Sequence, residues 1–329
     1  MPQPSNPRQF VLTHLHQLQS FWPAVHDADV ESVHDARVAT RRIRAALPFV
    51  FDAPEAAAKE LRRVGRALGR VRELDATDAL LTSLEQKAPD TAPAINVLRH
   101  DLHERLNRER RRMIKALERH PRAIIRAIER GDRLARFSSI WRSWRHELRE
   151  HVRSRAANVR EAIERATAVY MPNRSHAARI EIKKLRYTAE LAVAAGLLRN
   201  VDVLDQFKKV QNRLGMLHDL HVLSVALAES KVPEHASAQS LALASVIAAE
   251  LARVQSKYAR SRADVLAACD ACVRDTGRAA DAPGWAAAAI VAVPVLTAWY
   301  LGGPGEELST QVRIPDRKVP VPDATSGVA

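Results

Sequence analysis

One stretch of this chain recurs 142 residues later, and this repetition constrains the fold more than any other feature of the sequence. Residues 33–44 read V-H-D-A-R-V-A-T-R-R-I-R, and residues 175–186 read S-H-A-A-R-I-E-I-K-K-L-R. At 100° per residue, the histidine and the basic residues three, seven and ten positions later fall within about 80° of one another on a helix. Shifting the numbering by 142 residues superposes His34, Arg37, Arg41, Arg42 and Arg44 on His176, Arg179, Lys183, Lys184 and Arg186. The sequence therefore predicts one basic, histidine-led helical stripe that is built twice.

A second pair of segments recurs in the same order, at an offset of 146 residues. Residues 61–74 read L-R-R-V-G-R-A-L-G-R-V-R-E-L, and residues 207–220 read F-K-K-V-Q-N-R-L-G-M-L-H-D-L. Two basic residues, a Leu-Gly pair and an acidic-Leu pair match between the two segments. Because glycine and histidine are scarce in helices of this kind, the matches indicate internal duplication rather than a general likeness between basic helices. In the first copy, four arginines fall within about 100° on one side of the helix: Arg62, Arg63, Arg66 and Arg70.

The composition favours an all-α fold. Apolar residues make up 47% of the 329 residues, which is enough for a large core, whereas aromatic residues are only 5%. Ala, Leu, Arg and Glu dominate the chain, and these are strong helix formers. No stretch alternates between apolar and polar residues for long enough to predict a strand. We therefore expect an all-α protein made of two pseudo-symmetric four-helix bundles that enclose a basic groove or tunnel.

Apolar periodicity, prolines and capping residues place the expected elements. We expect a loose tail over 1–9, a helical domain over 10–279 with halves at about 10–170 and 175–279, an apolar segment over 283–303 and a disordered tail over 304–329. The helices are expected at about 10–21, 32–51 with Ser32 as N-cap, 55–68, 74–86, 94–120, 122–170 with breaks near Gly131 and Ser138, 175–198 with Ser175 as N-cap, 202–214, 219–229 and 237–274.

The segment Trp285–Leu301 is uncharged over 17 residues and carries aromatic residues at both ends. Its length lies at the lower limit of the roughly 17–25 residues that span a bilayer. Because it is rich in alanine and Pro294 interrupts its centre, we prefer an apolar helix that docks on the helical domain. Anchoring in a membrane remains the alternative.

Charge and cysteine content restrict the partners and the location. Lys and Arg total 51 against 38 Asp and Glu, a net charge of +13. Such an excess repels itself unless a polyanion offsets it, so nucleic acid, an anionic membrane and a phosphate polymer are the candidate partners. Two cysteines, Cys269 and Cys272, provide no disulfide framework. With no secretory signal at the N-terminus, we expect a cytoplasmic protein.

The repeated stripe has few carboxylates of its own and borders an apolar face formed by Val33, Ala36, Ile43 and Leu47. Since that face must pack inward, the neighbouring basic groups should line a groove or tunnel between helices. Planar guanidinium groups bind phosphate oxygens through two parallel hydrogen bonds and stay charged. Facing basic stripes would destabilise the fold unless an anion entered between them. The stripe is therefore interpreted as an anion-binding surface.

Other chemistry finds little support in the sequence. His34 and His176 have no second histidine or carboxylate four residues later, so no metal site is predicted there. The single C-x-x-C at Cys269 and Cys272 lies within a long apolar helix without a second pair, which makes zinc binding a weak alternative to two small core residues. Neither G-x-x-x-x-G-K-[ST] nor G-x-S-x-G occurs. No catalytic residue, metal or cofactor is expected.

With the repeat established, the chain resembles the CHAD family, the conserved histidine α-helical domain. The resemblance is carried by V-H-D-A-R-V-A-T-R-R-I-R-A-A-L at 33–47, S-H-A-A-R-I-E-I-K-K-L-R-Y-T-A-E-L at 175–191 and V-Q-N-R-L-G-M-L-H-D-L at 210–220, and extends over about 10–274. It implies two four-helix bundles around a basic tunnel that binds inorganic polyphosphate, in some members at polyphosphate granules. Arg72 departs from the pattern because it replaces the histidine of the second motif. Nothing in the chain could encode the CYTH triphosphatase domain that often precedes this one, so a binding module without chemistry of its own is expected.

We therefore expect non-enzymatic binding of inorganic polyphosphate. A nucleic-acid binder is the first rival, although only Tyr187 lies near a basic motif to stack on bases. The second rival is a protein that binds anionic lipid with help from the apolar segment, and the third is an enzyme of phosphate metabolism. The oligomeric state is not predicted. The candidate binding residues are His34, Arg37, Arg41, Arg42, Arg44, Arg62, Arg63, Arg66, Arg70, His176, Arg179, Lys183, Lys184, Arg186, Lys208, Lys209, Arg213 and His218.

Overall fold

The computed structural model describes residues 6–51, 54–119, 124, 140–166, 171–230, 233 and 236–278. The chain divides into two units, 1–288 and 289–329, and every described residue lies in the first. Three predictions lie outside the described residues. They are the apolar segment, the C-terminal tail and the helix breaks near Gly131 and Ser138. The description below therefore concerns the first unit alone.

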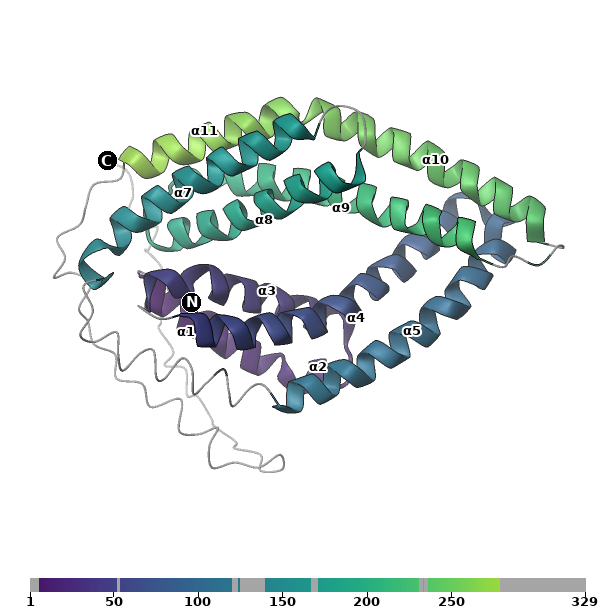
Figure 1. Cartoon of the computed structure of the whole chain (residues 1–329), viewed down its shortest axis with the longest axis horizontal. Coiled ribbons are helices and arrows are strands. Elements are labelled where there is room, and N and C mark those ends of the chain that lie inside the picture. Colours follow the sequence, from purple (N-terminus) through teal and green to yellow (C-terminus); the bar gives the residue numbers. More distant parts are fainter. Residues whose placement is uncertain are drawn as a thin grey trace, which may run out of the picture. The chain divides into compact units, whose positions relative to one another are not determined.

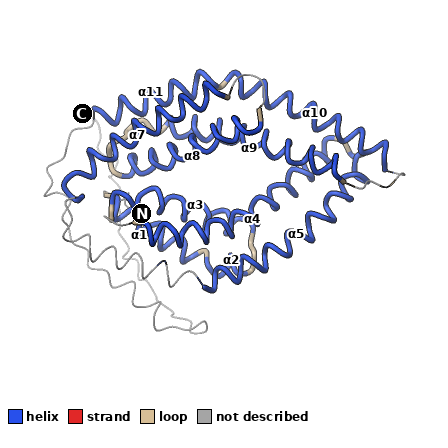
Figure 2. Tube along the Cα trace, viewed as in Figure 1, coloured by secondary structure: helices blue, strands red, loops and turns tan. Residues whose placement is uncertain are grey.

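The described residues form helices and no strand, which confirms the all-α prediction (Figures 1 and 2). The first half contains α1 (Pro7–Ser20), α2 (Trp22–His26), α3 (Val30–Ala46), the short 3-10 helix η1 (Leu47–Phe49), α4 (Glu55–Lys87), η2 (Pro89–Thr91) and α5 (Ala92–Arg119). The second half contains α7 (Ile140–Arg165), α8 (Pro172–Ala194), α9 (Asp202–Glu229), α10 (Ser237–Arg260) and α11 (Arg262–Arg278).

The predicted N-caps of the two motif helices are wrong. Helix α3 begins at Val30, because the Asp29 carboxylate accepts a hydrogen bond of 2.8 Å from the backbone N–H of Ser32 and so caps the first turn. Helix α8 begins at Pro172, whose fixed φ and missing N–H suit the first position of a helix. Ser175 is therefore a buried residue inside α8 rather than its cap.

The C-terminal ends of the two motif helices also come earlier than predicted. Helix α3 ends at Ala46, since Pro48 cannot continue its hydrogen bonds, and the chain passes into η1. Helix α8 ends at Ala194 instead of about 198, and Gly196 follows in the left-handed conformation with φ of 68°. Glycine adopts this conformation without a steric penalty, so it turns the chain out of the helix.

Two predicted helix pairs are single helices, and one predicted helix is two. Helices α4 and α9 run without a break through Gly69 and Gly215, where the sequence predicted that each would end. Conversely, the helix expected over 237–274 is divided at Ser261 into α10 and α11. The Ser261 hydroxyl donates to the Tyr258 carbonyl at 2.8 Å and takes up one of the carbonyls at the end of α10.

The packing brings the helices of the two repeated motifs together. Within the first half α3 packs on α1 and α4, and α4 packs on α5. In the second half α8 packs on α7 and α9, α9 packs on α10, and α11 packs on α7 and α9. Between the halves, α3 contacts α8, α4 contacts α9, and α10 contacts α5. Each motif helix therefore contacts the helix that carries the matching motif.

The apolar face predicted beside the basic stripe is buried as expected. Val33, Ala36 and Ile43 of α3 are fully shielded from solvent, and so is Leu47 at the start of η1. The equivalent face of α8 is buried through Ala178, Ile182, Leu185 and Ala189. Burial of these faces fixes the rotation of both helices and thereby fixes where their basic side chains point.

Within the part of the chain that the structure describes, no helix is long and apolar enough to cross a membrane. The segment Trp285–Leu301, for which docking and membrane anchoring were both considered, lies outside the described residues.

Candidate anion-binding site

Four basic side chains whose charges act on one another lie where α3 contacts α8, and we call them the central cation cluster. They are Arg37 and Arg41 of α3 with Arg179 and Lys183 of α8, two from each copy of the motif. Burial, followed by the charges of Arg41, Arg179 and Arg37, lowers the pKa of Lys183 to about 6. Burial and the neighbouring charge of Arg41 lower the pKa of Arg37 to about 10. The protein thus places mutually repelling charges together at the contact of its two halves.

Two helix glycines support the arginines of this cluster. A Cβ atom on Gly69 would lie 3.2 Å from Nε and Nη2 of Arg37, and a Cβ atom on Gly215 would lie 3.3 Å from Nη2 of Arg179. Each guanidinium group therefore packs directly on the backbone of the next helix. Gly69 and Gly215 are the matched glycines of the second sequence repeat, so the two halves use equivalent residues for equivalent contacts. This close approach explains the glycines inside α4 and α9.

Within the described part of the chain, Arg37 has a carboxylate partner and Arg179 has none. Its Nη2 donates to Oε1 of Glu73 at 3.0 Å, while Arg179 forms no ion pair with a described residue. Nor do Arg41 and Lys183 pair with a carboxylate among the described residues. Among the described residues, three of the four cations of the central cation cluster thus have no counter-charge in direct contact.

The predicted histidines lie beside the cluster in two equivalent pairs. Nε of Arg72 donates to Nδ1 of His34 at 3.2 Å, and the rings of His176 and His218 lie 5.2 Å apart. Arg72 thus takes the place in the first half that His218 takes in the second. Burial lowers the pKa of His34, and the charge of Arg72 adds to this effect. Burial also lowers the pKa of His218, against an opposing contribution from Asp219.

A further row of cations continues from the cluster along α3 and α4. Burial lowers the pKa of Arg44, and the neighbouring charges of Arg62, Arg41 and Arg66 lower it further. Because Arg41 belongs to the central cation cluster, Arg44 connects the cluster with the two arginines of α4. None of these side chains pairs with a carboxylate among the described residues.

Other candidate residues are neutralised, so the expectation of few carboxylates is wrong for them. Glu190 accepts from Nε of Arg42 at 2.7 Å and lies 3.6 Å from Nη1 of Arg186, which joins α3 to α8. The sequence missed these pairs because the carboxylates come from other turns and other helices. The remaining pairs are Arg63 with Glu60, Arg70 with Glu109 at 2.7 Å, and Lys184 with Glu181 at 2.6 Å.

The last three candidates stand apart from the cluster. Lys208 and Lys209 are exposed on α9, and Arg213 is half-buried one turn further along the helix. No hydrogen bond or ion pair connects these three side chains with the central cation cluster in the described part of the chain. They remain candidates only as a basic surface of α9.

Two carboxylates beside the cluster were not among the predicted site residues. Glu73 binds Arg37, and its counterpart Asp219 lies on α9. Burial raises the pKa of Asp219, while the charge of Arg179 opposes this and that of Glu73 adds to it. The sequence did contain a signal for both, because Glu73-Leu74 and Asp219-Leu220 match in the second repeat.

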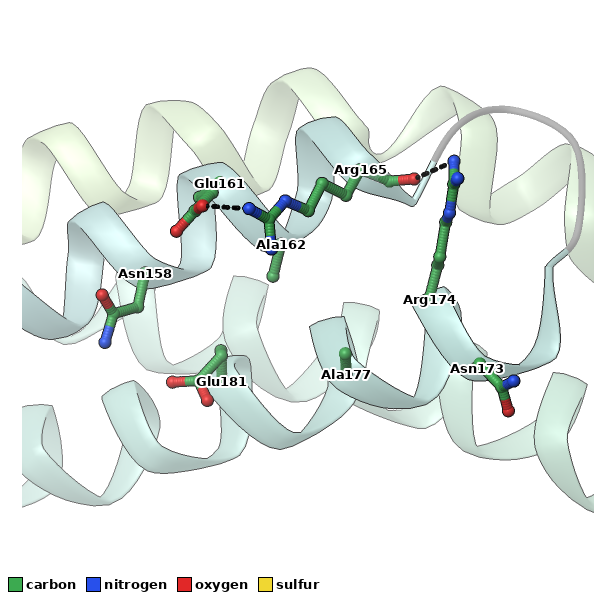
Figure 3. A pocket seen from close by; sticks show the side chains of 8 residues that line it. All are labelled: Asn158, Glu161, Ala162, Arg165, Asn173, Arg174, Ala177 and Glu181. Atoms are coloured by element: carbon green, nitrogen blue, oxygen red, sulfur yellow. Dashed lines mark hydrogen bonds and ion pairs between the residues drawn. The ribbon is translucent and has the colours of Figure 1, made fainter.

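A cavity of about 490 Å³ lies between α7 and α8, and none of the predicted binding residues lines it (Figure 3). Its lining includes two arginines and two glutamates, and Arg165 is paired with Glu161 at 2.6 Å. Arg174 instead donates to the Arg165 carbonyl at 3.4 Å. The lining has no excess of positive charge, so this cavity lacks the character of an anion site.

The two cysteines lie buried in α11 as free thiols. Burial raises the pKa of Cys269 and of Cys272 to about 12, so both are protonated at neutral pH. Across the described residues, no three His, Cys, Asp or Glu side chains are grouped so that they could hold a metal ion.

The fold and the cluster define an all-helical protein whose two halves meet at a strongly basic site. Residues 9–228 match the CHAD domain family, which is well over half of the chain, so this chain belongs to the CHAD family. Helices α10 and α11 lie beyond the matched residues.

Solved structures share this fold. The crystal structure of the CHAD domain from the plant Ricinus communis aligns with a TM-score of 0.51 and 21% sequence identity, over 85% of this chain and 94% of that one. PptA from Streptomyces chartreusis aligns with a TM-score of 0.51 and 18% identity, over 83% of this chain and 100% of its own. A comparison with curated protein sequences gives no match.

Proposed function

We propose that this protein binds inorganic polyphosphate, without catalysing a reaction, at the central cation cluster and along the row of cations on α3 and α4. The observation that carries the proposal is the cluster itself. Arg41, Arg179 and Lys183 lie together where α3 meets α8, and none of them pairs with a described carboxylate. Crowded cations of this kind reduce stability unless an anion binds among them.

A linear phosphate chain matches this arrangement. Guanidinium groups bind phosphate oxygens in a bidentate manner, and each residue of polyphosphate carries a negative charge. The cations continue from Arg41 through Arg44 to Arg62 and Arg66, so successive phosphates can each meet a basic side chain. The internal duplication inferred from the sequence would provide two equivalent sets of donors around one ligand path.

The aromatic residue beside the second motif favours a bare phosphate chain over nucleic acid. Tyr187 is only 4% exposed, and the guanidinium carbon of Arg186 lies 4.7 Å from the centre of its ring. A buried ring that is already covered by an arginine cannot stack on a base. We extend the proposal to a location on cytoplasmic polyphosphate granules, in keeping with the family resemblance.

Competition binding tests the proposal directly. Full-length protein is titrated with long-chain polyphosphate, single-stranded RNA and double-stranded DNA at matched phosphate concentration and salt. We expect polyphosphate to bind most tightly, with an affinity that falls steeply with salt because bound phosphates release counterions. Equal or tighter binding of RNA would make the protein a nucleic-acid binder instead.

A matched pair of double variants tests the site. Arg41→Ala with Arg179→Ala removes two cations of the cluster, while Arg105→Ala with Arg111→Ala removes two exposed cations of α5. Since one hydrogen bond to a charged group contributes about 1.5–3 kcal/mol, the first variant should bind polyphosphate at least tenfold more weakly. The second should lose no more than about threefold. Equal losses would leave only a generic basic surface.

A further inference from the structure

Lys183 differs from the other described lysines in its surroundings. Lys87 is paired with Glu250 and Lys184 with Glu181, whereas Lys208 and Lys209 are exposed to solvent. Lys183 is half-buried and forms no hydrogen bond or ion pair with any described residue. Within the described part of the chain, no partner therefore holds its ammonium group charged, and only part of the side chain reaches solvent.

The groups that face Lys183 are almost all cationic. Arg37 and Arg41 face it from α3 and Arg179 from one turn earlier in α8, while Glu73 of α4 is the one carboxylate whose charge acts on it among the described residues. Burial and three guanidinium charges outweigh this single carboxylate, so the neutral amine is favoured and the pKa falls to about 6. At neutral pH most of the Lys183 side chains then carry a free lone pair. A lysine activated by burial and neighbouring cations is a nucleophile.

The same guanidinium groups determine which electrophile the amine can meet. An acyl phosphate carries a phosphate dianion, which arginines bind, directly attached to a carbonyl carbon that an amine attacks. Binding of the phosphate to Arg37, Arg41 or Arg179 would hold that carbonyl beside Lys183. A neutral acyl donor lacks the anionic group and gains nothing from the three arginines.

We propose that Lys183 is an acylation site, at which small acyl phosphates such as acetyl phosphate transfer their acyl group to the protein. The Lys183 nitrogen attacks the carbonyl carbon and an amide C–N bond forms. The C–O bond to phosphate breaks with its electron pair on the departing oxygen, and the proton lost by nitrogen leaves on the released hydrogen phosphate. No oxidant or reductant is required.

Acylation would convert a titratable cation into a neutral amide in the middle of the central cation cluster. Its effect on polyphosphate binding rests on the proposed function, whereas the reaction itself needs only the arginines and the amine. We expect the acetylated protein to bind polyphosphate several-fold more weakly. Bound polyphosphate should in turn protect Lys183, because it occupies the same guanidinium groups.

The test measures acetylation of each lysine in the folded, full-length protein. Protein is incubated with acetyl phosphate at pH 7.5, and initial rates at Lys183, Lys184, Lys208 and the exposed Lys115 are determined by peptide mass spectrometry. We expect the rate at Lys183 to exceed each of the others at least fivefold. At acetyl phosphate concentrations well below saturation, where the rate reports the pKa of the free protein, the rate at Lys183 should level off above about pH 7. The rates at the exposed lysines should keep rising towards their ordinary pKa.

Two controls separate the contribution of the arginines from that of the anionic acyl donor. Arg179→Gln should slow acetylation of Lys183 and shift its pH midpoint upwards, while Arg105→Gln should leave both unchanged. A neutral acetyl ester should show a smaller preference for Lys183 than acetyl phosphate does. If Lys183 reacts no faster than Lys115 in the wild-type protein, the proposal is wrong, whatever the variants do. If Lys183 is acetylated selectively but the protein does not bind polyphosphate, the acylation site is supported and the proposed function is wrong.

Discussion

Arg37 and Arg179 occupy equivalent positions in the two motifs, but their electrostatic environments differ. Arg37 is bound by Glu73, whose side chain is 70% exposed, while Arg179 has no described carboxylate partner. A polyanion that binds Nη2 of Arg37 competes with Glu73 for this donor. The glutamate is therefore an internal competitor that occupies one arginine of the cluster in the free protein.

Replacing this competitor should strengthen binding. We expect Glu73→Gln to raise the affinity for long-chain polyphosphate about twofold to fivefold at low salt, because an exposed ion pair contributes up to about 1 kcal/mol. Isothermal titration calorimetry measures the change in the dissociation constant. Glu161→Gln is the matched control, since it removes an exposed glutamate that pairs with Arg165 within α7. An equal gain in both variants would show that only net charge matters.

Lys183 should make polyphosphate binding depend on pH. The free protein holds the Lys183 proton only below about pH 6, and a bound polyanion raises that pKa, so binding takes up a proton. Affinity should therefore fall as pH rises from 6 to 8, by up to about tenfold per pH unit. The internal phosphates of a long chain stay ionised throughout and do not contribute.

Replacing Lys183 by arginine separates the contribution of Lys183 to the pH dependence from that of the histidines. Lys183→Arg keeps a permanent charge and should bind polyphosphate with a flatter pH profile, in which His34 and His218 account for the remaining slope. Identical slopes for both proteins would exclude Lys183 as the titrating group.

The stability of the free protein should depend on pH in the opposite direction. The unfolded chain keeps the Lys183 proton up to its ordinary pKa of 10.5, so the free energy of unfolding rises with pH above about 6.

At the scale of whole helices, the long continuous α4 and α9 are the elements that support the arginines. A break at Gly69 or Gly215, as the sequence predicted, would remove the flat backbone on which the guanidinium groups of Arg37 and Arg179 pack. Glycine in a helix interior is normally less favourable than alanine by about 1 kcal/mol. The close contact of the arginine explains why each helix nevertheless carries a glycine here.

Gly215→Ala should therefore separate stability from binding. The new methyl group would lie 3.3 Å from Nη2 of Arg179, so the flexible end of that side chain must shift by a few tenths of an ångström. We expect polyphosphate affinity to fall several-fold, while the melting temperature stays the same or rises. Gly277→Ala in α11 meets no atom within 4 Å and should leave the affinity unchanged. Loss of affinity in both variants would contradict the special role of Gly215.

At the scale of the whole described unit, ion pairs join the two halves at separate points. Glu190 of α8 holds Arg42 of α3 together with Arg186, and Lys87 of α4 binds Glu250 of α10 at 3.0 Å. Glu190 and Arg186 are both only 13% exposed. The carboxylate of Glu190 is thus a resident counter-charge for Arg42 and Arg186 at the contact of α3 with α8.

Glu190→Gln should destabilise the protein and make it depend on ligand. Without the carboxylate, the guanidinium groups of Arg42 and Arg186 remain uncompensated, which should lower the free energy of unfolding by about 2 kcal/mol after allowance for their partial exposure. Added polyphosphate should raise the melting temperature of this variant more than that of the wild type, because it supplies the missing negative charge. Glu150→Gln removes an exposed pair with Arg153 within α7 and should change neither quantity. Equal stabilisation of variant and wild type by polyphosphate would show that the ligand does not reach Arg42 and Arg186.

The sequence alone determined the helical class, the family and the equivalent cations of the two motif helices. Helix-forming composition and the 3.6-residue period define amphipathic helices, and the repeated order of His, Arg and Lys places equivalent cations on α3 and α8. These properties depend on residues within a few turns of one another. Local periodicity is sufficient to predict them.

Only the tertiary structure decided which of those cations are free. Glu190 comes to Arg42 from the other half of the chain, 148 residues away, and Glu73 comes to Arg37 from the next helix. Packing likewise decided the continuity of α4 and α9. The guanidinium groups of Arg37 and Arg179 pack on the helix backbone at Gly69 and Gly215, which requires an unbroken helix there. Counter-charges and helix breaks depend on contacts between distant residues, and no local sequence pattern encodes such contacts.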